Sequence, residues 1–109
     1  MHYVDHQPGG WFLVEYQGDL YLDARYAWNG MVDDSALIKL NEDESADHRA
    51  RGREAIAELA QAIADRPPYR EKSPWHGRDL FRAPEGEVWR NLVQAAIVNH
   101  TWIAQQRRR

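Results

Sequence analysis

The first half of the chain alternates between short β-prone runs and polar breaks. Two such runs cover residues 11–16 and 20–28, with Gly18-Asp19 between them, and a third covers residues 36–40. Glycine readily supplies the positive φ that a two-residue hairpin turn needs. The pattern therefore predicts a three-stranded antiparallel meander.

The hairpin register sorts the side chains of the first two runs onto two faces. With Gly18 and Asp19 as loop residues, Gln17 pairs with Leu20, and alternate positions share a face. The face that we expect to form the core carries Trp11, Leu13, Leu20, Leu22, Ala24, Tyr26 and Trp28. The other face mixes aromatic, apolar and charged groups: Phe12, Val14, Tyr16, Tyr21, Asp23 and Arg25. Two interpretations remain open for this second face: a half-covered surface with tyrosine hydroxyls in water, or a partner-binding surface rich in Tyr and Arg.

A helix is predicted directly after the third run. Asn41 is a favourable N-cap, and Glu44 stands where a capping box needs it. Helical spacing of apolar residues continues to Asp65, before Pro67-Pro68. Gly52 lies inside this helix, where it costs about 1 kcal/mol relative to alanine. It marks either a close backbone approach or a weak point.

The second half of the chain predicts a long connection and a last helix. Four large side chains in the proline-punctuated connection are expected to pack onto the domain and order it: Tyr69, Trp75, Leu80 and Phe81. The last helix has a broad apolar face and ends near the C-terminal arginines. The predicted fold class is α+β, with a three-stranded antiparallel meander followed by two helices packed on one sheet face. In chain order, a single domain over 1–109 divides into a lead-in (1–10), the β-meander (11–41), a helix (42–65), an ordered connection (66–84) and a C-terminal helix (85–106).

Composition limits the classes of function. The chain has 109 residues and no cysteine, which excludes disulfides, thiolate nucleophiles and cysteine-ligated zinc. It has no signal-peptide pattern at its start and no apolar stretch near the roughly 20 residues of a membrane helix. We expect a cytoplasmic protein that does not bind a membrane.

Catalytic motifs are weak. His76 and Asp79, in the tetrapeptide His-Gly-Arg-Asp, are the best candidates for acid–base chemistry. His2 and His6 have metal-ligand spacing for a helix, but Pro8 and two glycines follow them closely. The chain has no phosphate-binding glycine loop, nucleophile elbow or metal motif. We therefore expect no catalytic residues, no metal and no cofactor.

Charge is distributed unevenly along the chain. Residues 1–47 hold ten acidic and two basic residues, whereas residues 48–109 hold seven acidic and twelve basic ones. Acidic residues gather on both sides of the third strand, at Asp33, Asp34, Glu42, Asp43, Glu44 and Asp47. Such a group suits a basic partner, although helix capping accounts for half of it. The predicted partner-binding residues are these six acids with Tyr16, Tyr21, Arg25 and Trp75.

The layout of residues 11–65 resembles that of a known family. The segments YLDARY and LIKLNEDE, followed by a helix containing GR-x-x-I-x-x-L-A, are similar to small immunity proteins encoded beside polymorphic or contact-dependent growth-inhibition toxins. The resemblance implies a cytosolic, non-enzymatic inhibitor that binds one cognate toxin domain, often a nuclease, and blocks its active site.

Two other functions remain open. One is a small nucleic-acid-associated regulatory protein that uses Arg49, Arg51, Arg53 and the C-terminal arginines. The other is a small hydrolase that uses His76 and Asp79. The leading interpretation requires neither nucleic acid nor a membrane as partner.

Overall fold

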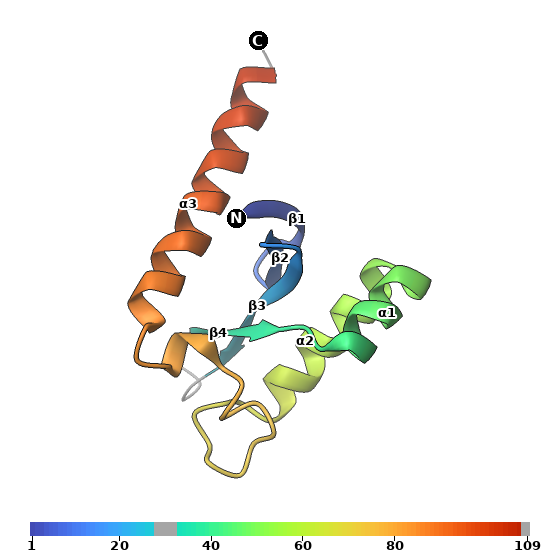
Figure 1. Ribbon diagram of the computed structural model, residues 1–109, viewed down its shortest axis with the longest axis vertical. Helices are drawn as coiled ribbons and strands as arrows, with labels where there is room; N and C mark the ends of the chain where they lie inside the picture. The colour runs from blue at the N-terminus through green and yellow to red at the C-terminus, as the bar shows by residue number, and fades with distance from the viewer. Residues whose placement is uncertain (28–32, 108–109) are drawn as a thin grey trace.

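The chain forms an α+β fold with one antiparallel sheet, as the predicted fold class requires (Figure 1). The computed structural model describes residues 1–27 and 33–107, and side chains as far as residue 101. The strands follow one another in the order β1-β2-β3-β4. They are β1 (His2–Gln7), β2 (Trp11–Tyr16), β3 (Asp19–Ala27) and β4 (Asp33–Lys39). The helices are α1 (Glu42–Arg51), α2 (Arg53–Asp65), the short 3-10 helix η1 (Leu80–Arg82) and α3 (Gly86–Arg107).

The segment expected to be a lead-in is instead the first strand. β1 pairs antiparallel with β2, from His2 opposite Glu15 to Gln7 opposite Trp11, with a register shift between Tyr3 and Asp5. The sheet is therefore four-stranded, not three-stranded. Pro8, Gly9 and Gly10, expected to separate the lead-in from the first strand, form the turn between two strands.

The β2–β3 hairpin turns one residue earlier than expected. Tyr16 pairs with Asp19, so the loop residues are Gln17 and Gly18, with φ of 53° and 85°. Two consecutive positive φ values are typical of the turn that matches the twist of paired strands. Moving the turn by one residue moves the register by two, and side chains alternate with period two. The assignment of residues to faces therefore survives, except for Trp28, which lies outside the described residues.

The predicted single helix over 42–65 is wrong, because the helix is interrupted at Gly52. Asn41 and Glu44 form the expected capping box at the start of α1. Gly52 then adopts φ 68° and ψ −139°, a conformation that suits glycine, and α2 begins at Arg53. A Cβ added at Gly52 would meet nothing within 4 Å. Of the two meanings considered for this glycine, the weak point is therefore correct and the close approach is not.

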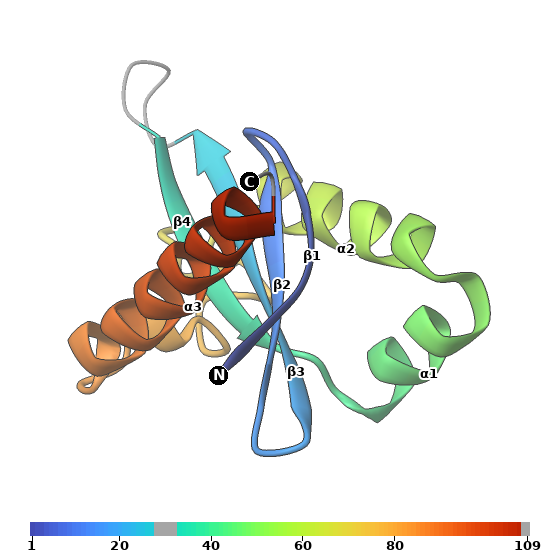
Figure 2. The same cartoon turned by 90° about the horizontal axis from the view of Figure 1, so that it is seen from above.

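The two main helices cover opposite faces of the sheet, not the same face (Figure 2). α2 packs Ile56, Ala60 and Ile63 against the face that carries Leu13 and Leu22. α3 packs Val93 and Ala96 against Val14, Tyr21 and Leu37 on the other face. The second face of the hairpin, with its aromatic and charged groups, needs this cover because several of its side chains are too apolar to face water.

The connection over 66–84 is ordered by the side chains that were expected to hold it. Trp75 and Phe81 are buried, one in each of the two cores. Asp79 caps η1 and forms an isolated bridge with Ile38, so the connection lies along the free edge of β4. The connection thereby links the end of α2 on one face to the start of α3 on the other.

Candidate partner-binding site

Glu44 at the start of α1 is occupied by contacts within the chain. Its Oε1 accepts a hydrogen bond from the Asn41 N–H at 2.9 Å, and Asn41 Oδ1 accepts one from the Glu44 N–H at 2.8 Å. Arg78 donates to both Glu44 oxygens, at 2.6 and 3.1 Å. Partial burial opposes ionisation, but the hydrogen bonds from Arg78 and Asn41 outweigh it, so the pKa of Glu44 lies below its usual value. Glu44 therefore fixes α1 to the connection and is not a free charge.

α1 is an exposed arm that carries the remaining acids of this group. It has no buried side chain, and it stands away from the sheet in Figure 2. Arg51, the last residue of α1, holds it to α2 by hydrogen bonds to Glu58 at 2.5 and 3.1 Å, and it also donates to Asp47 within α1 at 2.7 Å. The hydrogen bond from Arg51 lowers the pKa of Asp47. Exposed ion pairs add little stability, but the pair between Arg51 and Glu58 fixes the orientation of a helix that has no buried side chain of its own.

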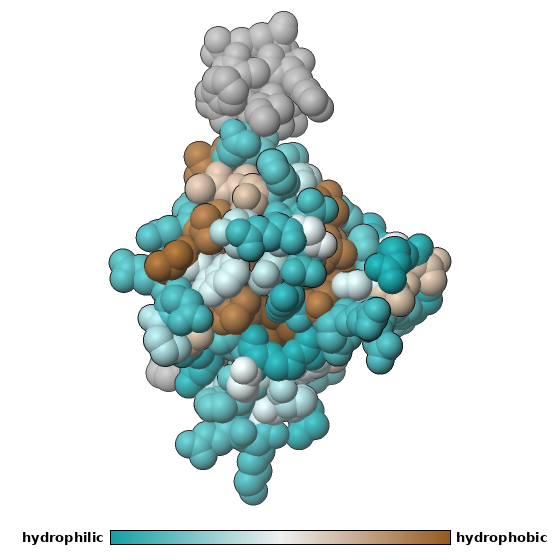
Figure 3. Space-filling view, viewed as in Figure 1, coloured by the Kyte–Doolittle hydropathy of each residue, from teal (hydrophilic) through white to brown (hydrophobic). Residues whose placement is uncertain are grey.

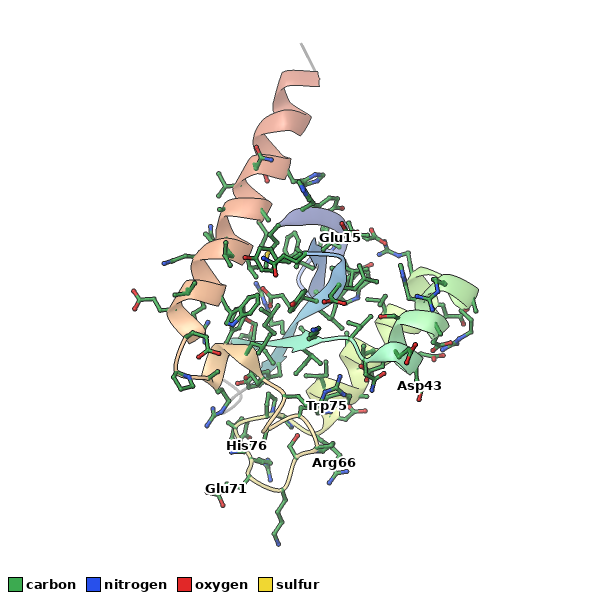
Figure 4. The ribbon with its side chains drawn as sticks, in the orientation of Figure 1. Glu15, Asp43, Arg66, Glu71, Trp75 and His76 are labelled. Carbon is green, nitrogen blue, oxygen red and sulfur yellow. The ribbon has the colours of Figure 1, made fainter. Side chains whose placement is uncertain are left out.

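An open groove of about 780 Å³ separates α1 from the β2–β3 hairpin. Its apolar lining residues are Val4, Leu20 and Leu40, and its charged ones are Glu15, Asp19, Lys39, Glu42 and Arg49. Lys39 pairs with Asp19 at 3.3 Å. Within the described part of the chain, Glu15 and Glu42 form no ion pair, and neither does the adjacent Asp43. Figure 4 shows Glu15 on the sheet and Asp43 on α1, where the Asp43 carboxylate points away from the body of the protein.

Asp33 and Asp34 lie apart from the acids of α1. They begin β4, whereas α1 follows its end, and seven strand residues span about 20 Å. Asp34 accepts a hydrogen bond from the Ser35 N–H at 2.8 Å and lies 3.9 Å from Arg90. The six acids therefore form two groups at opposite ends of one strand.

Two of the aromatic anchors are core residues. Tyr21 is only 6% exposed and packs against Trp89 of α3, with ring centroids 5.3 Å apart, and Tyr16 packs at its edge. Trp75 is 9% exposed and donates from Nε1 to the Ala62 carbonyl at 3.2 Å. Their rings thus face the interior, whereas Arg25 is exposed. The burial of Tyr21 and the partial burial of Tyr16 follow from the correction above, because α3 covers the face that carries them.

His76 and Asp79 have separate hydrogen-bond partners. His76 Nδ1 lies 2.7 Å from the Pro68 carbonyl oxygen. Asp79 is 4% exposed, and its Oδ1 accepts from the N–H groups of Leu37 and Phe81, both at 3.0 Å. These contacts give each residue a role in holding the connection, and they do not form an acid–base pair.

Two of the arginines considered for nucleic-acid binding, Arg51 and Arg53, make ion pairs within the chain. Arg51 binds Asp47 and Glu58, as described above. Arg53 binds Asp5 at 2.9 Å and lies 5.1 Å above the ring of Trp11. Arg49 lines the groove. The side chains of the C-terminal arginines lie outside the described residues.

Asp23 is the residue whose importance the sequence pattern does not reveal. It lies on β3 between Phe12 of β2 and Leu37 of β4, on the face that α3 covers. Burial raises its pKa to about 6, against a hydrogen bond from Ser35 and the charges of Arg25 and Arg90. Asp23 alternates with Tyr21 and Arg25 along one face of β3, and this alternation was the available signal. Without knowledge of α3, the pattern predicts a solvent-exposed side chain at that position.

Among the residues that the structure describes, no cluster of three or more His, Cys, Asp or Glu side chains is placed to hold a metal ion. None of the described helices is long and apolar enough to cross a membrane. Comparisons of the chain with protein-family models, with curated proteins and with solved structures found no match.

Proposed function

We propose that the chain is an immunity protein that binds a cognate toxin domain in the cytoplasm and blocks its active site. In this proposal the toxin presents a basic surface, as nucleases do for their substrate, and α1 is the element that meets it. The layout of residues 11–65 supports the choice of family. The exposed acids of α1 support the choice of binding surface.

The observation that carries the proposal is an acidic helix start that is exposed and yet held in place. Glu42 and Asp43 are exposed, while the capping box orders the start of their helix, and the Arg78–Glu44 and Arg51–Glu58 pairs fix it to the rest of the chain. A surface that is ordered before binding loses less conformational entropy on association. The open groove beside α1 adds apolar area from Leu20 and Leu40 that a partner side chain can cover.

Charge supports a specific role for this end of the molecule. Acids on an exposed arm attract a basic surface over a distance and raise the association rate at low ionic strength. Asp33 and Asp34 extend this surface for a partner that spans β4. Tyr16, Tyr21 and Trp75 contribute indirectly, because they hold the sheet, the connection and α3 in place.

The test is protection of cells by co-expression with the toxin domain encoded by the adjacent reading frame. The wild-type chain should restore growth and should form a stable complex with the purified domain. Reversal of charge in the E42K/D43K double variant should lower the association rate at least tenfold and weaken its salt dependence.

A matched control is available on α3. Glu85 and Glu87 are exposed and flank the start of that helix, so the E85K/E87K variant suffers a similar helix-dipole cost at a different place. Circular dichroism and thermal unfolding should show both variants folded. Equal loss of binding in the two double variants, or none in E42K/D43K, would remove α1 from the interface. Failure of the wild-type chain to protect would reject the immunity function itself.

A further inference from the structure

A second, smaller pocket lies on the opposite face of the sheet, between β3, β4, η1 and α3. Its volume is about 350 Å³. The polar residues that line it are Asp23, Ser35, Arg90, Asn91 and Gln94, and Phe81 is among its apolar ones. Binding sites for small molecules typically combine an apolar wall with a few converging polar groups. The surface of α1 plays no part in this pocket, although Asp34, which pairs with Arg90, lies beside it.

The pocket contains one charge of each sign, and the two are not paired with each other. Among the residues that the structure describes, no ion pair joins Asp23 to Arg90. Asp23 receives a hydrogen bond from Ser35, but burial still disfavours its charged form. Arg90 is about half exposed, and its guanidinium carbon lies 4.4 Å from the centre of the Phe81 ring. Its ion pair with Asp34 is long, with 3.9 Å between the nitrogen and the carboxylate oxygen.

The residues around Asp23 do not neutralise it. Arg25, on the same face of β3, is exposed to water, and Arg90 approaches from α3. Asp79, whose negative charge also acts on Asp23, is buried, and its Oδ2 has no hydrogen-bond partner in the described part of the protein. This face thus holds two carboxylates, Asp79 buried and Asp23 half-buried at the wall of an open pocket.

We propose that this pocket binds a small zwitterion of the amino-acid class. The ammonium group of the ligand pairs with Asp23 and donates to Ser35, and its carboxylate pairs with Arg90. A ligand of this kind bridges two charges that the protein leaves apart. Its ammonium group gives Asp23 the hydrogen-bond donors that water would otherwise provide. Asn91 and Gln94, at the exposed rim of the pocket, accept or donate hydrogen bonds to the remaining polar groups of the ligand.

The experiment is an NMR titration of the folded chain with L-alanine and with γ-aminobutyrate, which place the two charges at different separations. Ethylammonium and acetate serve as single-charge probes. At least one zwitterion should shift the amide signals of Ser35, Phe81 and Arg90 to Gln94 in a saturable manner. Its affinity should exceed that of either single-charge probe at least tenfold.

The variants Asp23→Asn and Arg90→Gln should each weaken zwitterion binding at least tenfold. Removal of a poorly compensated, half-buried charge should stabilise the fold, and thermal unfolding of Asp23→Asn checks that any loss of binding does not come from unfolding. Glu87→Gln, an exposed change on the same helix, should bind as the wild type does. The proposal is overturned by the absence of saturable shifts at millimolar zwitterion, by acetate binding as tightly as the zwitterions, or by unchanged affinity in Asp23→Asn. Each of these outcomes leaves toxin binding through α1 unaffected.

Discussion

Leu13, Leu22 and Ile38 line the sheet beneath α2, whereas Tyr21, Asp23 and Leu37 line it beneath α3. The first face is an ordinary apolar core that packs against Ile56, Ala60 and Ile63 of α2. Tryptophan and tyrosine side chains complete it. The second face mixes apolar side chains with a carboxylate, and the helix over it leaves a pocket.

The difference is one of packing: one face of the sheet is a continuous apolar core, and the other leaves a carboxylate beside a pocket. Apolar burial stabilises a domain roughly in proportion to area, and the α2 face contains most of the large side chains that are fully removed from water. The α3 face includes a charge that opposes folding at neutral pH. A small domain has little stability to spare, so such a charge points to a role other than stability.

Removal of core volume should affect the α2 face more strongly. Ile63 is fully buried beneath the sheet, so Ile63→Ala should lower the free energy of unfolding by about 4 kcal/mol. Val93→Ala beneath α3 removes less volume beside a pocket and should cost about 2 kcal/mol. Chemical denaturation of both variants checks the comparison. An equal or larger loss in Val93→Ala would mean that the two faces contribute alike.

The pairing of β2 with β3 depends on the turn between them. Gly18 has φ of 85°, so Gly18→Val should lower the free energy of unfolding by about 2–3 kcal/mol, because a β-branched residue resists this conformation. Gly77 is a matched control, since it is also exposed with no atom near its Cβ position but has no positive φ. Thermal or denaturant unfolding of Gly77→Val should show a much smaller loss. Equal effects of the two substitutions would show that the turn does not set the register.

The sequence predicted the hairpin faces because side-chain alternation has a period of two and is insensitive to a two-residue change of register. It also predicted the capping box at Asn41 and Glu44, which depends on residues three positions apart. Both features depend on residues that are close in the sequence, so the sequence alone predicts them.

Other features depend on contacts between distant segments, and there the sequence was insufficient. β1 contains alternating polar residues that pair only because β2 is beside it, and the side of the sheet that α3 covers is decided by the path of residues 66–84. The placement of Tyr21 as core and of Asp23 in a pocket follows from that path. Neither residue differs in local pattern from an exposed strand position.

Substitution of Asp23 is the smallest of the predicted effects on stability, and it has the opposite sign. Its pKa is raised from 3.8 to about 6 by burial, so the folded state disfavours the charged form. Stability from the neutral carboxyl is fully present below the unfolded pKa near 4, and it is lost as the pH rises through about 6. Since Asp23 is only partly shielded from water, Asp23→Asn should raise the free energy of unfolding at pH 7 by about 1–2 kcal/mol. The gain should vanish below pH 4, where the aspartate is already neutral.

Denaturant unfolding of both proteins from pH 4 to pH 7.5 measures this difference, with the exposed Asp33→Asn as control. A gain that is independent of pH would assign the effect to packing, and a loss at pH 7 would mean that the charge of Asp23 stabilises the α3 face through Arg25 and Arg90.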